Sequence, residues 1–211
     1  MIRIAIADDH AIVRKGLKQI IAGIPELTVT GEAASADELL TLLRSQTFDL
    51  LVLDLTLGTR SGIELLKQIK GQYERLPVLV LSMHAEELFA IRALRAGASG
   101  YVQKEDAPEE LLQAIRRIAA GGTYVSSNMA SAIAAHMFQG GGRAALPHER
   151  LTDREHEIFR LLGSGKSVGE IATSLNLSVK TVSTHRTHIL KKTGLRTNAD
   201  IIRYSILNHL A

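Results

Sequence analysis

Between residues 1 and 121 of the chain, short apolar runs alternate with stretches of helical periodicity. Runs of Val, Ile and Leu without polar alternation indicate strands covered on both faces, as in a parallel sheet between two layers of helices. A helix is expected after each strand, and five such units predict an α/β, flavodoxin-like (βα)5 doubly wound fold. The expected strands are Ile2–Ala7, Leu27–Ala33, Leu50–Leu53, Val78–Leu81 and Gly100–Val102.

The first and last of these helices have clear apolar stripes. Pro25 follows the end of the first helix, and Pro108 stands where the first turn of the last helix accepts a proline. Both stripes indicate helices that bury one side. Their members are Ile12, Val13, Leu17, Ile20 and Ile21 in the first helix and Leu111, Leu112, Ile115, Ile118 and Ala119 in the last.

Residues 151–211 have a different pattern, which predicts four helices and no strand. A short second helix, Val168–Leu175, is followed by a tight turn and a longer basic helix that ends near Thr193. This arrangement predicts a helix-turn-helix within a small all-α domain. The expected cap residues are Thr152, Ser167, Ser178 and Thr197, with Glu155 and Asp200 spaced to complete capping boxes.

A connector joins the two parts. Ser126 or Ser127 is expected to start an Ala-rich helix that runs to about Phe138. Three glycines followed by a proline, within Gly140–Pro147, then predict a flexible tether. The expected organisation is therefore a first domain at 1–121, a linker with one helix at 122–146 and a helical domain at 147–211.

The net charge of +3 conceals an asymmetry between these parts. Up to Phe138 there are 14 Lys and Arg against 16 Asp and Glu, a balance of −2, and the remaining residues have 11 against 6, a balance of +5. A basic second part indicates a polyanionic partner.

The chain has no Cys, which excludes disulfides and thiolate metal sites. Without a membrane-length apolar run or a signal-peptide pattern, a cytoplasmic protein is expected.

Polar side chains follow several predicted strands directly. Asp8 and Asp9 come after the first strand and Asp54 after the third, and the carboxyl ends of parallel strands meet at one edge of the sheet. Carboxylates gathered in one crevice favour a hard cation, which predicts a Mg²⁺ site. Ser82 and Lys104 follow the next two strands, so an incoming phosphoryl group could be neutralised by the metal and by an ammonium, with one aspartate as nucleophile.

This set of residues resembles the receiver domain of two-component response regulators, over about residues 1–121. The resemblance implies that Asp54 takes the phosphoryl group, that Asp9, Asp54 and the Thr56 carbonyl hold Mg²⁺, and that Asp8 assists. It also implies that Ser82 and Lys104 contact the phosphoryl oxygens and that Tyr101 changes rotamer as a reporter. The matching features are the Asp8-Asp9 pair, Asp54 after Leu-Val-Leu, Gly62 in Thr-Arg-Ser-Gly, Ser82 in Leu-Ser-Met-His, Ala-Gly-Ala-Ser-Gly-Tyr ending at Tyr101, and Lys104.

One loop departs from that family. Leu57-Gly58 stands where the family usually has Met-Pro, and glycine frees the backbone that proline would restrain. The affinity for Mg²⁺ or the lifetime of the phosphoryl group is expected to differ from the norm. Taken singly, Asp8 or Asp9 could instead cap a helix that begins at Ala11, and only the joint pattern of strand-end residues favours the site.

The longer basic helix has a surface suited to a polyanion. No acidic residue occurs between Glu170 and Asp200, as a surface that meets phosphates requires. Within this helix Val179, Val182 and Ile189 are expected to be buried, with His185 at the margin of the buried side.

Four runs in this part of the chain are Leu-Thr-Asp-Arg-Glu, Glu-Ile-Ala-Thr-Ser-Leu, Leu-Ser-Val-Lys-Thr-Val-Ser-Thr-His and Leu-Lys-Lys. With these runs, the helix and its surroundings resemble the LuxR-type DNA-binding domain. By resemblance, the major-groove readers are Ser183, Thr184 and Thr187, and the phosphate contacts are Lys180, His185, Arg186 and Lys191.

Together the two resemblances imply a member of the NarL/FixJ subfamily, a transcription regulator and not an enzyme. They imply a sensor histidine kinase, promoter DNA and RNA polymerase as partners. Phosphorylation of Asp54 would relieve inhibition between the domains and promote a homodimer on DNA, through the exposed side of the last helix. Two alternatives remain at this point: an enzyme that hydrolyses phosphate esters through an aspartyl intermediate, and a DNA-binding protein whose first domain only dimerises.

Overall fold

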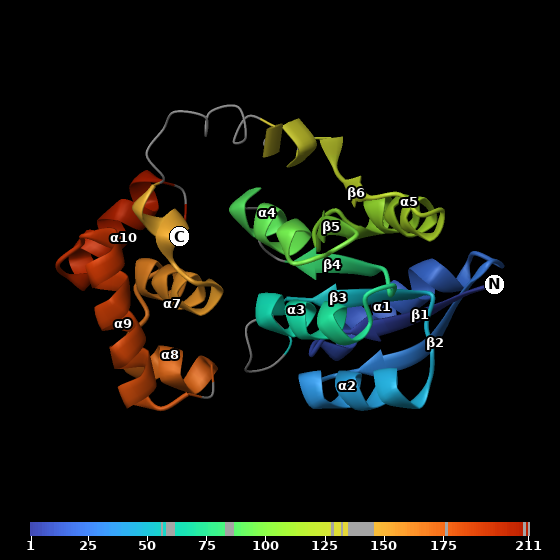
Figure 1. The fold of residues 1–211 in the computed structure, drawn as a ribbon, viewed down its shortest axis with the longest axis horizontal. Coiled ribbons are helices and arrows are strands. Elements are labelled where there is room, and N and C mark those ends of the chain that lie inside the picture. The colour runs from blue at the N-terminus through green and yellow to red at the C-terminus, as the bar shows by residue number, and fades with distance from the viewer. Residues whose placement is uncertain are drawn as a thin grey trace. The chain divides into compact units, whose positions relative to one another are not determined.

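The computed structural model describes residues 1–55, 57, 62–82, 87–127, 129–131, 133–134, 146–175, 177–208 and 210. The chain divides into two compact units, Met1–Met137 and Phe138–Ala211, each with its own hydrophobic core. The first unit contains helices and strands and the second contains helices, as Figure 1 shows. Among the described residues, no helix is both long and apolar enough to cross a membrane.

The first unit is built on a parallel sheet in the order β2-β1-β3-β4-β5-β6. The chain begins near the middle of the sheet and adds strands on both sides, which confirms the predicted flavodoxin-like fold. The last strand was not predicted, because its two residues are too few for a sequence pattern and it forms only by pairing with β5. The strands are β1 (Ile2–Ala7), β2 (Leu27–Ala33), β3 (Leu50–Asp54), β4 (Val78–Ser82), β5 (Gly100–Gln103) and β6 (Tyr124–Val125).

Helices cover both faces of this sheet (Figure 1). Apolar residues of α1 and α5 pack on one face, and those of α2, α3 and α4 pack on the other. Every residue of β3 and β4 is buried, as expected for unbroken apolar strands between two helix layers. The helices are α1 (Ala11–Ala22), α2 (Ala36–Ser45), α3 (Gly62–Gln72), α4 (Glu87–Arg95) and α5 (Ala107–Ala119).

The predicted apolar stripe of α1 is wrong at one position. Leu17 and Ile21 are buried as expected, but the side chain of Ile12 is 82% exposed. Ile12 lies about 140° around the helix from Leu17, which places it on the solvent side. An apolar residue in the first turn of a helix therefore extended the predicted stripe beyond the side that faces the sheet.

Gly62 allows α3 to begin very close to the end of β3. A methyl group on this residue would overlap the carbonyl group of Leu55. Leu55 directly follows Asp54, so the contact holds the backbone behind that carboxylate. The glycine is therefore required by close packing beside the predicted site.

Within its described residues, the second unit consists of a short 3₁₀ helix and four α-helices, which confirms the predicted all-α domain. The predicted caps are also confirmed: Thr152, Ser167 and Thr197 form complete capping boxes, and Ser178 caps the long helix. These local side-chain bonds satisfy backbone N–H groups that the helices leave open. The elements are η1 (Pro147–Arg150), α7 (Asp153–Gly163), α8 (Val168–Ser174), α9 (Val179–Thr193) and α10 (Asn198–Leu207).

The core of the second unit lies between these helices. Ile158 and Phe159 of α7, Val182 and Ile189 of α9 and Ile201 of α10 are fully buried. The prediction that Val179 is buried is wrong, because its side chain is 56% exposed. This residue begins α9, before the helix reaches the core.

In the connector, residues 127, 129–131 and 133–134 are helical as predicted, while the rest of the predicted helix and the Gly140–Ala145 stretch lie outside the described residues.

Candidate functional site

The three predicted acidic residues lie together at the carboxyl ends of β1 and β3. These strands are neighbours, with Ala7 paired to Leu53, so Asp8 and Asp54 extend from adjacent positions. Both side chains are buried, whereas Asp9 is exposed. One oxygen from each of the three carboxylates, together with one nitrogen of His10, lies within 4.8 Å of the others. The sheet thus gathers the acids as the sequence predicted.

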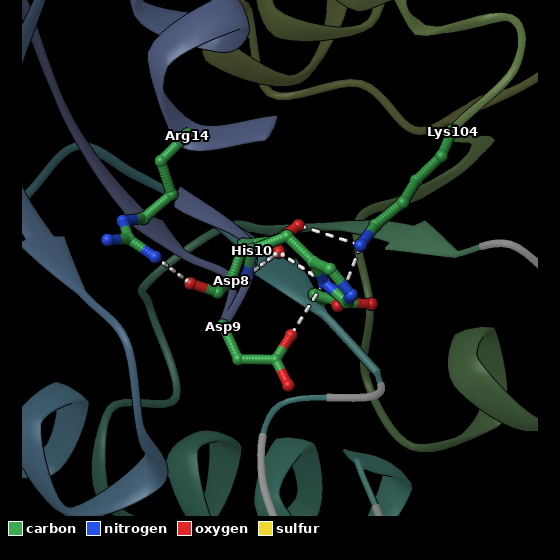
Figure 2. Close-up of polar contacts among 6 residues, drawn as sticks. Asp8, Asp9, His10, Arg14 and Lys104 are labelled. Atoms are coloured by element: carbon green, nitrogen blue, oxygen red, sulfur yellow. Dashed lines mark hydrogen bonds and ion pairs between the residues drawn. The ribbon is translucent and has the colours of Figure 1, made fainter. Parts of the chain in front are cut away.

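Lys104 joins the two buried carboxylates (Figure 2). Its Nζ lies 2.7 Å from Oδ2 of Asp8 and 2.7 Å from Oδ2 of Asp54, and its backbone N–H donates to the Ser82 carbonyl at 2.9 Å. Burial by itself lowers the pKa of Lys104, but hydrogen bonds to Asp54 and Asp8 outweigh it and the pKa is raised. The lysine therefore remains an ammonium ion within the cluster.

His10 and Arg14 also hold the acidic cluster, and neither residue was predicted from the sequence. The His10 backbone N–H donates to Oδ1 of Asp8 at 2.8 Å, and its Nδ1 lies 2.7 Å from Oδ1 of Asp9 and 3.2 Å from Oδ1 of Asp8. Arg14 donates to the Asp8 carbonyl at 2.6 Å. Figure 2 shows Arg14 and Lys104 reaching the cluster from opposite sides. The available signal was position: His10 directly follows the acids, and Arg14 comes one helical turn later.

These contacts do not support the alternative that Asp8 or Asp9 caps α1. The N-cap residue of α1 is His10, which has no side-chain cap hydrogen bond. Asp8 instead accepts the N–H of His10, which precedes the helix, and Asp9 lies against the imidazole. Both carboxylates therefore face the cluster.

The donor chemistry of the cluster fits a hard divalent cation. Carboxylate oxygens of Asp8, Asp9 and Asp54 are the ligands that Mg²⁺ prefers, and they converge from two strands. Lys104 offsets part of their charge, which leaves a net negative cluster that a cation stabilises. Thr56, predicted to add a carbonyl oxygen, lies outside the described residues, as does Gly58.

Ser82 and Tyr101 lie on the neighbouring strands. Ser82 is the last residue of β4 and Tyr101 the second of β5, and both are fully buried. Tyr101 is paired with Val80, two residues before Ser82, so the ring and the hydroxyl project to the same face of the sheet. The hydroxyl thus stands at the strand end beside the acids, with the aromatic ring behind it.

In the second unit, α8 and α9 form the predicted helix-turn-helix. α9 ends at Gly194, whose φ of 76° is the left-handed conformation that favours glycine after a helix. The predicted DNA-facing residues divide into two groups by exposure. Lys180, Ser183, Thr184, Thr187 and Lys191 are exposed, whereas His185 and Arg186 are partly buried at the margin.

Two basic residues of α9 bind other helices of the same unit. Nζ of Lys192 donates to Oε2 of Glu155 at 2.6 Å, and Nε of Arg186 donates to Oδ1 of Asn198 at 2.6 Å. Burial raises the pKa of Glu155, but the hydrogen bonds from Lys192 and Thr152 outweigh it and hold the pKa below its usual value. These pairs orient α9 relative to the first turns of α7 and α10.

Both parts of the chain match families of known proteins. Residues 4–116 match the response regulator receiver domain, and residues 149–205 match the bacterial regulatory proteins of the luxR family. The transcriptional regulatory protein UhpA of Salmonella typhimurium is 36% identical over 95% of this chain and 96% of its own length. The transcriptional regulatory protein LiaR of Bacillus subtilis is 34% identical over 100% of this chain and 99% of its own.

A solved structure has the same organisation. RcsB from Salmonella enterica serovar Typhimurium, bound to promoter rprA in the presence of the phosphomimetic BeF₃⁻, is 28% identical. It superposes with a TM-score of 0.68 and covers 96% of this chain and 97% of that one. The likeness extends over both units of the chain, so the receiver and LuxR-type resemblances seen in the sequence are confirmed.

Proposed function

Because the chain belongs to the NarL/FixJ subfamily of two-component response regulators, we propose that its transcription-regulating activity is controlled by phosphorylation of Asp54. The donor is a partner sensor histidine kinase. The observation that carries this proposal is the placement of Asp54: a fully buried carboxylate, 2.7 Å from the Lys104 ammonium and beside two further acids. A buried carboxylate held beside an ammonium group can act as a nucleophile toward a phosphoryl group, because the positive charge offsets the repulsion between the two anions.

In the transfer, an Asp54 carboxylate oxygen forms a bond to phosphorus as the bond between phosphorus and the donor histidine nitrogen breaks. That nitrogen keeps the electron pair of the broken bond. Asp8, Asp9, Asp54 and the Thr56 carbonyl would hold Mg²⁺, which would neutralise part of the phosphoryl charge. Lys104 turns from the Asp54 oxygen to the phosphoryl oxygens, and Ser82 donates a hydrogen bond to them. His10 and Arg14 keep the Asp8 and Asp9 carboxylates in place.

The phosphoryl group then acts as a switch. The Ser82 hydroxyl moves toward the new anion, and Tyr101 moves into the space it leaves. This change relieves inhibition between the domains and shifts the protein toward a homodimer that binds promoter DNA. Ile206 and Leu207 of α10 support a dimer surface, because they are 62% and 73% exposed on the last helix of the DNA-binding unit.

On DNA, α9 enters the major groove. Ser183, Thr184 and Thr187 reach base edges, while Lys180, His185, Arg186 and Lys191 contact phosphates. RcsB, which was solved on promoter DNA with a phosphomimetic, supports promoter DNA as the partner. RNA polymerase is the further partner, and the cytoplasm, where promoter DNA lies in bacteria, is the site of action.

The test compares wild-type protein with Asp54→Asn, using a genomic fragment recovered by footprinting with acetyl-phosphate-treated protein. Fluorescence anisotropy with and without beryllofluoride and Mg²⁺ measures DNA affinity, and native mass spectrometry measures stoichiometry. We expect tighter, dimeric binding with beryllofluoride for wild type and no response for Asp54→Asn. Binding that beryllofluoride leaves unchanged would support the alternative in which the receiver only dimerises.

The enzyme alternative has its own readout. Incubation with acetyl phosphate is expected to give a single phosphoryl adduct on Asp54, detected by intact mass. The initial burst should release at most one equivalent of acetate per protein. Sustained turnover of acetyl phosphate or of a generic phosphate ester would contradict the regulator and favour a hydrolase.

A further inference from the structure

The residues that follow α5 return to the receiver sheet before the connector begins. β6 pairs in parallel with β5, with Gly100 opposite Tyr124 and Tyr101 opposite Val125, and the Tyr124 N–H donates to the Ser99 carbonyl at 3.0 Å. A Cβ on Gly100 would lie 2.8 Å from the Tyr124 carbonyl oxygen, so the close pairing requires glycine there. The first part of the predicted linker is thus a strand of the receiver.

The two residues of β6 contact opposite faces of the sheet. Tyr124 packs with the cluster under α1 and α5, whereas Val125 packs with the cluster that contains Tyr101. Since paired residues in a parallel sheet project to the same side, Val125 stands beside the ring of Tyr101. The predicted reporter residue therefore has the connector as its immediate neighbour.

A helical turn continues this contact. Ser126 begins it, accepting the N–H of Met129 on its Oγ at 3.3 Å and that of Ala130 on its carbonyl at 2.8 Å. Met129 is 5% exposed and belongs to the same buried cluster as Tyr101, and Ile133 packs against that cluster. Met129 and Ile133 are spaced one helical turn apart, and Val125 of β6 packs against the same cluster, so these three side chains face the receiver.

We infer that the described residues of this segment, 124–127, 129–131 and 133–134, are docked on the receiver, respond to the position of Tyr101 and pass its movement to the chain leading to the DNA-binding unit. The inference rests on the proposed function, in which phosphorylation moves that ring. A close-packed cluster cannot lose one ring without displacing the side chains around it. When Tyr101 moves toward Ser82, Val125 and Met129 lose their packing contacts in the cluster and the segment detaches.

The segment is suited to such a change because its strand is short. β6 has only two residues, and short strands at the edge of a sheet open at low free-energy cost. Strands β3 and β4 of the same sheet are buried at every position and stay in place. A small displacement of one ring can therefore detach the segment while the receiver remains folded.

Hydrogen–deuterium exchange of the full chain tests the inference. With Mg²⁺ and beryllofluoride, amides within 124–134 are expected to exchange at least about tenfold faster, while the amides of β3 and β4 stay protected. Protection near Asp54 and Lys104 in the same data reports whether beryllofluoride is bound. Bound beryllofluoride with unchanged exchange in the segment overturns the inference, whereas failure to bind contradicts the proposed function itself.

Two matched truncations give a second measurement. Met129→Ala removes one of the side chains that dock the segment on the receiver. The amides of the segment are therefore expected to exchange fast even without beryllofluoride. Adding beryllofluoride is then expected to change DNA affinity less than about twofold. Leu17→Ala removes a comparable buried side chain from the cluster on the other face and should keep the full response. A Met129→Ala protein with the wild-type response would overturn the inference, and the wild-type exchange data decide the matter if either variant fails to fold.

Discussion

The Lys192 ammonium of α9 lies 2.6 Å from a carboxylate oxygen of Glu155, in the first turn of α7. The same oxygen accepts the N–H of Thr152 at 2.8 Å, so one buried group completes a capping box and anchors α9. A residue expected from sequence only as a helix cap thus also holds the orientation of the helix that we propose enters the major groove.

Replacing Glu155 with Gln should destabilise the second unit. The substitution removes an ionic partner of Lys192 and weakens the capping box, and we expect a loss of about 1–3 kcal/mol in the free energy of unfolding by urea titration. Glu170→Gln, in an exposed capping box on α8, is the control and should cost less. Equal losses in the two variants would show that the Lys192 contact contributes nothing.

The same pair gives a pH dependence with a defined sign. Because the pKa of Glu155 is lowered in the folded state, its stabilisation is present above the usual carboxyl pKa and is lost as pH falls through the lowered value. Thermal midpoints of residues 147–211 in the full chain should therefore fall on acidification through and below the usual carboxyl pKa range, and less steeply in Glu155→Gln. Parallel curves for the two proteins would contradict this assignment.

Lys104→Met should leave the receiver dependent on a divalent cation for stability. The two buried carboxylates lose their shared ammonium, and breaking a buried pair typically costs about 3–5 kcal/mol. Mg²⁺ can offset part of that repulsion, so differential scanning fluorimetry should show a larger rise in the unfolding temperature with Mg²⁺ than in wild type. Lys15→Met, at an exposed position of α1, should behave as wild type.

Two glycines of α3 should respond in opposite directions to alanine. Gly62→Ala places a methyl group into the Leu55 carbonyl, and overpacking of this kind costs about 1–3 kcal/mol. Gly71 has no neighbouring atom within 4 Å of an added methyl group, so Gly71→Ala should stabilise the helix by about 0.5–1 kcal/mol. Urea unfolding of the two variants measures both signs, and a neutral Gly62→Ala would remove the packing argument.

Lys191→Ala and Ser183→Ala should weaken DNA binding in different ways. Loss of a phosphate contact lowers affinity for all sequences and reduces the slope of log K against log salt by about 1. Loss of a base-reading hydroxyl should cost about 1–3 kcal/mol on the selected fragment and little on unrelated DNA. Anisotropy over a salt series with both DNAs separates these effects, and an unchanged slope in Lys191→Ala would argue against the phosphate assignment.

The sequence by itself determined the elements of this protein and the chemistry at their ends. Short apolar runs identified five strands, and Asp8, Asp9 and Asp54 were placed correctly because parallel strands bring their carboxyl ends to one edge. The capping boxes were predictable because each depends on residues three positions apart. These features follow from local periodicity, which the sequence contains in full.

Only the tertiary structure decided what depends on partners distant along the chain. Ile12 and Val179 are exposed because packing, not periodicity alone, selects the buried side of a helix. β6 exists because the edge of β5 satisfies its backbone, and Lys104 bridges two acids because three strand ends converge. Such contacts are made by residues that the fold brings together, and no short-range pattern in the sequence specifies them.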